Sequence, residues 1–234
     1  ELDLEADELA IEGFNSNKLY LEKSIDFNTV DLNNVNVHYI KSSKFNSIKS
    51  RDTTPITQKL FAVVNGIYGN QLNINNLKMS AMLPESMHSF DSLYTSFRDI
   101  SVSPPDLQCQ DRILCSRGVS ARLRNYSYLN QKKLQQLHFK SFEASSIDSI
   151  LRIKEMYYAP TLDESEFLDN LRHRKTFFSA DLKEVWSNSF NFYELYNSNK
   201  LIAKKLVLES PEMMIAENLK KARKSGKVPT FPNE

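Results

Sequence analysis

The chain has 234 residues, a formal net charge of +1 and 5 glycines, whereas an average protein contains about 7% glycine. No two glycines form a G-x-G pair and none precedes a Lys-Ser or Lys-Thr pair, which excludes the P-loop and the dinucleotide-binding fingerprint. Hairpins use glycine at their tight turns, so the scarcity also argues against β-sandwiches and barrels. The composition therefore favours long helices with few tight turns.

The first 52 residues predict a short acidic helix followed by an extended arm. Residues 1–12 place aliphatic side chains among acids, and Gly13 is a suitable helix end. Residues 24–50 are rich in Asn and Ser, and Val35–Ile40 contains β-favouring residues. This segment fits an extended arm, a single edge strand or an ordered loop.

The rest of the chain predicts a mainly α-helical protein. Apolar residues recur at helical spacing, and proline or capping residues stand before them. About nine or ten helices are expected over the whole chain. Those after the arm begin near Pro55, Pro84, Asp106, Leu129, Ile147, Thr161, Ser179 and Pro211. Residues 53–227 are thus expected to form a domain of stacked helical hairpins, an α-solenoid-like arrangement, followed by a polar tail over 228–234.

Three expected helices end in similar strings that run through charged residues to a proline: residues 97–104, 153–160 and 222–229. Pro160 and Pro229 lie twice a helical-hairpin period apart. These strings, and the segment from Thr54 to Gly66, resemble parts of pentatricopeptide (PPR) repeats. The resemblance implies an organellar RNA-binding protein. Ser165 stands where that family has an aromatic residue, so no base-reading code transfers, and a generic array of α-hairpins fits the punctuation equally well.

A basic stretch between residues 112 and 140 is the leading candidate for RNA binding. It contains seven cations and no acid, with tyrosines interleaved. Cations neutralise phosphates, and exposed aromatic rings stack on unpaired bases. A second basic patch follows near the C-terminus, where the macrodipole of the expected last helix also favours cations. The predicted RNA-binding residues are Arg112, Arg117, Arg122, Arg124, Tyr126, Tyr128, Lys132, Lys133, Lys140, Lys220, Lys221, Arg223 and Lys224.

The alternatives for the basic stretch are an acidic protein partner or a solvated face whose cations pair with acids elsewhere, including those of the N-terminus. A second cluster, of aromatic residues, is expected to be partly core and partly a protein-docking surface, because one helix face cannot hide all of it. The predicted protein-interface residues are Trp186, Phe190, Phe192, Tyr193 and Tyr196.

The sequence offers no motif for catalysis, a metal or a cofactor. The four histidines are widely spaced, and G-x-S-x-G is absent. Cys109 and Cys115 fit neither a zinc site nor a disulfide framework, so reduced thiols in an intracellular compartment are expected. The chain contains no apolar run of 18 residues, so no membrane span is predicted.

These observations predict a non-catalytic subunit or factor of a mitochondrial ribonucleoprotein, located in the matrix, that binds mRNA or rRNA and other protein subunits. A component of the mitochondrial ribosome and an mRNA-specific translation factor both fit. The alternative is an α-helical scaffold subunit of a cytosolic or nuclear complex that has protein partners only.

Overall fold

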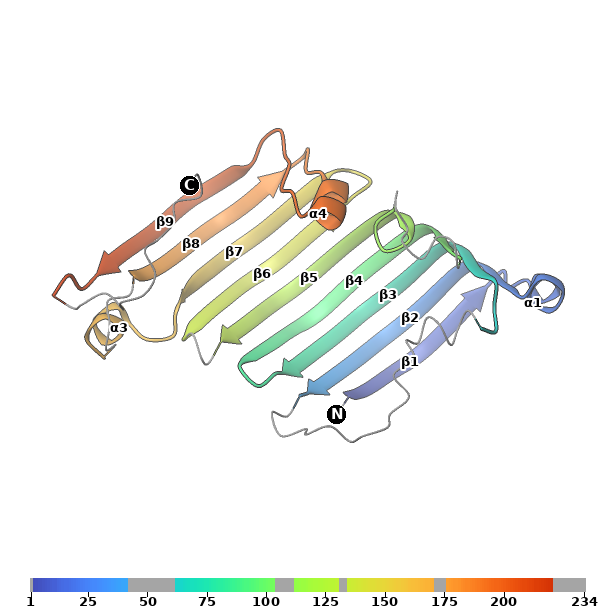
Figure 1. Cartoon of the computed structure of the whole chain (residues 1–234), viewed down its shortest axis with the longest axis horizontal. Coiled ribbons are helices and arrows are strands. Elements are labelled where there is room, and N and C mark those ends of the chain that lie inside the picture. The colour runs from blue at the N-terminus through green and yellow to red at the C-terminus, as the bar shows by residue number, and fades with distance from the viewer. Residues whose placement is uncertain (1, 42–61, 104–111, 131–133, 171–175, 221–234) are drawn as a thin grey trace.

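The computed structural model describes residues 2–41, 62–103, 112–130, 134–170 and 176–220. In this part of the chain nine strands lie side by side in one layer (Figure 1), in the same order as along the sequence. The strands are β1 (Leu2–Glu12), β2 (Ser24–Ile40), β3 (Gly66–Met82), β4 (Ser86–Val102), β5 (Ser116–Asn130), β6 (Gln135–Ser145), β7 (Ile150–Pro160), β8 (Thr176–Ser187) and β9 (Val207–Glu217).

Neighbouring strands pair antiparallel, except that β2 and β3 run parallel. Three described helices of seven residues each stand at strand ends: α1 (Ser16–Glu22), α3 (Glu164–Asn170) and α4 (Phe192–Ser198). Figure 1 shows α1 and α4 at one end of the strands and α3 at the other. A helix of this length spans only about 10 Å, so none of the three can cover the sheet.

The prediction of a mainly α-helical protein built from stacked hairpins is therefore wrong. The expected helix over 1–12 is β1, and the helices expected from Pro84, Ile147 and Pro211 correspond to β4, β7 and β9. The helix expected from Leu129 falls across the end of β5 and the start of β6, and the one from Ser179 falls largely in β8. The helical-repeat character implied by the PPR resemblance is overturned with them. The helices expected from Pro55 and Asp106 begin outside the described residues.

Two local predictions come closer to the structure. The segment after Thr161 does form a helix, α3. Asp163 caps it by accepting a hydrogen bond from the Glu166 backbone nitrogen at 2.8 Å. The β-favouring segment Val35–Ile40 does lie in a strand, but that strand is β2, which has a neighbour on each side.

Most of each strand alternates apolar and polar side chains, and directly opposite residues on neighbouring strands share a face. Every strand interrupts this alternation once, by a step of three between consecutive apolar positions. The nine steps are Ala6–Leu9, Leu32–Val35, Ile74–Leu77, Phe90–Leu93, Leu123–Tyr126, Phe139–Phe142, Ile153–Met156, Leu182–Val185 and Leu208–Pro211. The two residues inside each step form a line across the sheet, which we call the seam. Each of the nine strands inserts one extra residue at the same level of the sheet. Neighbouring strands therefore stay in register, and beyond the seam the apolar side chains return to the same face.

The seam has a definite backbone conformation. In the five strands that run in one direction, the second seam residue is left-handed, with φ between 46° and 56°. These residues are Asn34, Asn76, Asn125, Glu155 and Ser210. Asparagine tolerates this conformation better than most residues, and three of the five are asparagine. Hydrogen bonds join seam residues of neighbouring strands. The Asn76 side-chain nitrogen donates to Asn34 Oδ1 at 2.8 Å, and the Asn125 side-chain nitrogen donates to Asp91 Oδ2 at 2.7 Å.

The parallel pair β2–β3 carries a ladder of amide and carboxylate side chains. Asn73 donates to Asp31 at 2.7 Å, and Asn75 donates to Asn33 at 2.9 Å. Each bonded pair is separated by 42 residues in the sequence, because the two strands repeat the same polar pattern in register. The ladder fixes this parallel pairing on the face opposite the apolar residues.

The well-buried side chains are few and lie in separate places. Phe27 is 8% exposed and its ring covers Gly69, where a Cβ atom would approach the ring to within 2.2 Å. Phe167 of α3 packs edge-on against Phe177 of β8, with ring centroids 5.6 Å apart. The absence of a single compact core among the described residues follows from a sheet that has only one layer.

Candidate functional site

One face of the sheet carries apolar side chains from all nine described strands. Rows of directly opposite residues cross it from strand to strand. The central row contains seven residues, one from each of β3 to β9: Leu77, Leu93, Leu123, Phe142, Ile153, Val185 and Leu208. A second row contains Ile11, Val30, Leu72, Phe97 and Val119. Along β1 the apolar face extends from Leu2 to Ile11, which is about 30 Å at the usual rise per residue.

This apolar face is not covered by the described part of the chain. Its residues on the edge strands are strongly exposed, for example Leu9 at 58% and Met213 at 56%. The central row is only half-buried in β3 to β7, and its member in β8, Val185, is buried at 7% exposure. Its members touch one another sideways, and the described strands form one layer with no second layer over them. Exposed apolar surface of this extent marks a place where a ligand or a partner binds.

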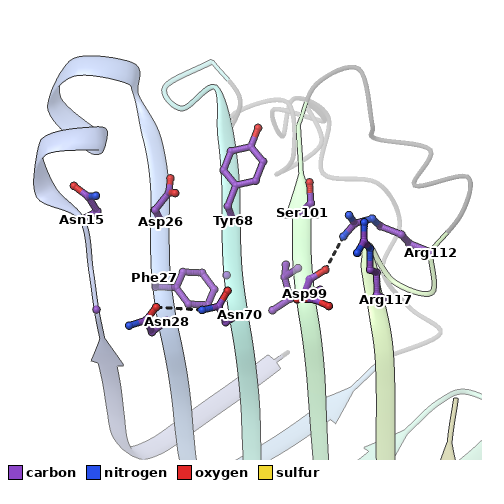
Figure 2. A pocket seen from close by; sticks show the side chains of 13 residues that line it. Asn15, Asp26, Phe27, Asn28, Tyr68, Asn70, Asp99, Ser101, Arg112 and Arg117 are labelled. Carbon is purple, nitrogen blue, oxygen red and sulfur yellow. Dashed lines mark hydrogen bonds between the residues drawn. The ribbon is translucent and has the colours of Figure 1, made fainter. Parts of the chain in front are cut away.

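One margin of the apolar face is polar and hollowed. Continuing two residues beyond Val30 and Leu72 on the same face, Asn28 and Asn70 are joined by a hydrogen bond of 3.2 Å. A pocket of about 390 Å³ opens here (Figure 2), lined by side chains that include Asn28, Asn70, Tyr68, Arg112 and Arg117. Arg112 Nη1 donates to the carbonyl oxygen of Asp99, a left-handed residue, at 2.6 Å. The pocket thus places two guanidinium groups at one margin of the apolar face.

Asp26 lies on this margin and is held by two donors. Lys18 Nζ of α1 lies 2.6 Å from Asp26 Oδ2, and the hydroxyl of Ser24 donates to Asp26 Oδ1. Partial burial acts to raise the pKa of Asp26, but the hydrogen bonds from Lys18 and Ser24 together outweigh it, so the pKa lies below its ordinary value of 3.8. The pair fastens α1 to β2 beside the pocket.

Because the pKa of Asp26 is lower in the folded chain, its ion pair stabilises the fold above pH 4 and loses that effect as the pH falls through the folded-state pKa. Asp26→Asn is therefore expected to lower the free energy of unfolding by less than about 1 kcal/mol at pH 7, as for other partly exposed pairs. The difference from the wild type should shrink at pH 3. Urea unfolding at both pH values measures this, and an equal difference at pH 3 would contradict the assignment.

The opposite margin carries aromatic side chains with polar tips. Tyr126 Oη lies 3.0 Å from His88 Nδ1, and Asn130 donates to Tyr128 Oη at 2.9 Å. The Tyr126 ring stacks on Phe139 of the neighbouring strand, with centroids 4.7 Å apart, and burial raises the pKa of its hydroxyl. Such residues suit a boundary between an apolar surface and water.

The predicted RNA-binding residues do not form one surface. Arg122 and Arg124 lie on the polar face, where Arg122 Nε is 3.0 Å from Glu143 Oε1. Tyr126 and Tyr128 lie beyond the seam on the apolar face, opposite to the arginines with which they were grouped. Lys140 pairs with Glu155 at 2.6 Å. The pairing of cations with acids of neighbouring strands matches the solvated-face alternative, although the acids of β1 are too far across the sheet to take part.

The remaining predicted RNA-binding residues are separate from these. Arg112 and Arg117 line the pocket at the polar margin, and Lys220 follows β9. Lys132, Lys133, Lys221, Arg223 and Lys224 lie outside the described residues. RNA binding stays a prediction that no observed contact supports.

The predicted protein-interface cluster is divided between several elements. Trp186 is in β8, with Lys205 Nζ 5.9 Å from its ring centroid. Phe190 is buried at 4% exposure and packs on Phe192, with centroids 4.7 Å apart. Tyr193 and Tyr196 belong to α4, and Tyr196 is half exposed. The expected helical stripe does not exist. Phe190 is buried and Tyr196 is exposed, and the protein interface stays a prediction.

Cys115 is disulfide-bonded, which contradicts the expectation of reduced thiols. Among the described residues there is no group of three or more acids, histidines or cysteines that could hold a metal ion. None of the helices in the described ranges has the length and apolar character needed to cross a membrane.

Sequence reasoning missed the apolar face, although two signals for it are present. The strings Leu32-Asn-Asn-Val35 and Ile74-Asn-Asn-Leu77 repeat at an offset of 42 residues, inside longer stretches of strict alternation. Leu123-Arg-Asn-Tyr126 has the same form. In each string, a step of three and an asparagine before the second apolar residue mark a strand that crosses the seam.

Comparisons with known proteins add no family to this description. The chain matches no protein-family model, and searches of curated proteins and of solved structures likewise found no match.

Proposed function

We propose that the protein is a non-catalytic binding protein whose apolar face holds the hydrocarbon chains of lipids. The observation that carries this proposal is the set of apolar rows that crosses all nine strands and is left uncovered by the described residues. The face is about 30 Å along the strands and about 38 Å across them at usual strand spacings, which is larger than a compact small-molecule pocket. A flexible, elongated apolar ligand fits such a surface.

The chemistry of the two margins supports an amphipathic ligand. One margin presents Arg112, Arg117 and side-chain amides, which suit a polar headgroup. The other presents tyrosine and histidine rings with polar tips. Between them the central row contains only aliphatic and phenyl side chains, which offer hydrocarbon contacts and no hydrogen-bonding groups.

The disulfide at Cys115 bears on the compartment. Disulfides persist in oxidising environments and are uncommon in the cytosol. We therefore propose an oxidising compartment in place of the intracellular one expected from the cysteine count.

A fluorescence titration tests the proposed function. The probe is a fatty acid that carries a dansyl group, whose emission rises in an apolar environment. The variant with Leu93→Glu and Leu123→Glu places two carboxylates directly opposite each other in the central row. The matched control, Ser96→Glu with Ser120→Glu, does the same on the polar face of the same two strands. We expect the first variant to bind the probe at least tenfold more weakly than wild type, because carboxylates are costly to place in hydrocarbon.

The control variant is expected to bind the probe as the wild type does, and circular dichroism should show strand content unchanged in both variants. Failure of the wild type to bind the probe, or equal weakening in the two variants, would contradict the proposal.

A further inference from the structure

Within the described part of the chain, strand β1 pairs on one side of its backbone only. It lies at the edge of the sheet and pairs only with β2. Ten of its eleven residues are exposed, and no described residue bonds to the outer edge. An edge strand of this length offers a row of free N–H and C=O groups to another strand. It contains no proline and no lysine, two residues that commonly protect sheet edges.

The side chains of β1 are sorted by face. Leu2, Leu4, Leu9 and Ile11 extend the apolar face and are 50% to 62% exposed. Asp3, Glu5, Glu8 and Glu12 lie on the polar face, opposite His38, Asn36, Asn33 and Thr29 of β2. Glu8 accepts a hydrogen bond from Asn33 at 2.8 Å, and none of the four carboxylates has a lysine or arginine partner in the described part of the chain.

This charge pattern disfavours the two self-associations that the edge would otherwise permit. Pairing of β1 with β1 of a second copy would bring carboxylates of both strands close together on the polar face. Pairing with the other edge strand, β9, would bring them near Glu209 and Glu212, which lie on the polar face of that strand. Like charges on directly opposite residues destabilise a strand pair.

We propose that the free edge of β1 binds an extended segment of a partner protein in which apolar residues alternate with Lys or Arg. The backbone of that segment completes the hydrogen bonding of β1, its apolar side chains continue the apolar face, and its cations face the four carboxylates. The face supplies the hydrophobic part of the contact and the charges supply the selectivity. This interaction uses the edge of the sheet and does not depend on lipid binding.

Fluorescence anisotropy on the full chain tests the proposal with end-blocked, labelled peptides of 11 residues. One peptide alternates valine with lysine, a second replaces every lysine by glutamate, and a third keeps the lysines but replaces two interior valines by proline. We expect the lysine peptide to bind at least tenfold more tightly than either of the other two. Proline removes a backbone donor and disrupts strand pairing without a change in charge.

Charge reversal provides the matched variants. Replacing Asp3, Glu5, Glu8 and Glu12 by lysine is expected to reverse the preference, so that the glutamate peptide binds more tightly. Replacing Glu209 and Glu212 by lysine on the opposite edge should leave the preference unchanged, as should the Leu93→Glu, Leu123→Glu variant.

Three outcomes overturn the proposal. The first is that the wild type binds none of the peptides, and the second is that the lysine and glutamate peptides bind equally. The third is equal binding of the lysine peptide and its proline version, which would show electrostatic adhesion without strand pairing. All three use the wild-type chain, so a folding defect in a variant does not affect them.

Discussion

Deletion of Asn125 is expected to prevent the chain from forming a stable sheet. Asn125 is the extra residue that β5 inserts at the seam, between Leu123 and Tyr126. Without it, the residues on one side of the seam must turn to the opposite face, since side chains alternate with a period of two. Tyr126 and Tyr128 would then face the polar side while both neighbouring strands keep their own alternation. The loss should exceed about 5 kcal/mol, comparable with the whole stability of many domains.

Substitutions at the same position provide the control for this deletion. Asn125→Gly keeps the residue count and adopts the left-handed φ of 51° readily. It removes only the exposed hydrogen bond to Asp91, so its free energy of unfolding should stay within about 1 kcal/mol of wild type. Asn125→Val keeps the count but should cost about 1–2 kcal/mol, because a β-branched residue is strained there. Circular dichroism and urea unfolding distinguish the three. A deletion variant that unfolds with the wild-type midpoint would show that the seam does not set the facing of the strands.

Phe27→Ala is expected to destabilise the chain by about 3 kcal/mol. Phe27 is one of the few well-buried side chains, and its ring lies over the backbone of the parallel neighbour β3 at Gly69. Removal of the ring exposes this backbone and removes the packing that joins β2 to β3 at that end. Urea unfolding followed by circular dichroism measures the loss.

Gly69→Ala tests whether the ring and the glycine act together. In the wild-type background the new Cβ meets the ring at 2.2 Å, so a cost of about 1–3 kcal/mol is expected from overpacking. In the Phe27→Ala background the space is free, and the same change should be neutral or stabilise slightly. The double-mutant cycle should therefore show an interaction energy above about 1 kcal/mol. Strictly additive effects would mean that the close contact does not limit the size of residue 69.

The helical prediction failed for a reason that is visible in particular residues. Phe90 and Leu93 are three positions apart, as on one face of a helix, and so are Leu182 and Val185. In the structure both pairs are seam steps within strands. Each strand contains one such step, and a search for helical spacing finds it together with a chance neighbour such as Tyr94 or Trp186. The alternation of apolar and polar residues on either side of the step was the stronger signal.

Local chemistry was easier to predict than tertiary arrangement. The start of α3 could be predicted near the correct residue, because capping depends on a few adjacent positions. The candidate site could not be assembled in this way. Its rows join residues from up to seven strands, and each row depends on a register that no single segment specifies. The grouping of Arg122 and Arg124 with Tyr126 and Tyr128 shows the limit, since neighbours in sequence lie on opposite faces once Asn125 intervenes.

The agreement between strand order and chain order has a consequence for biosynthesis. Each strand from β2 onward pairs with the strand that precedes it in the sequence. When such a strand leaves the ribosome, one of its partners has already been synthesised, and no strand must be inserted between two that are already paired. The sheet can therefore grow by addition of strands at one edge during translation. The longest stretch of chain synthesised between two consecutive strands separates β2 from β3, across residues 41–65.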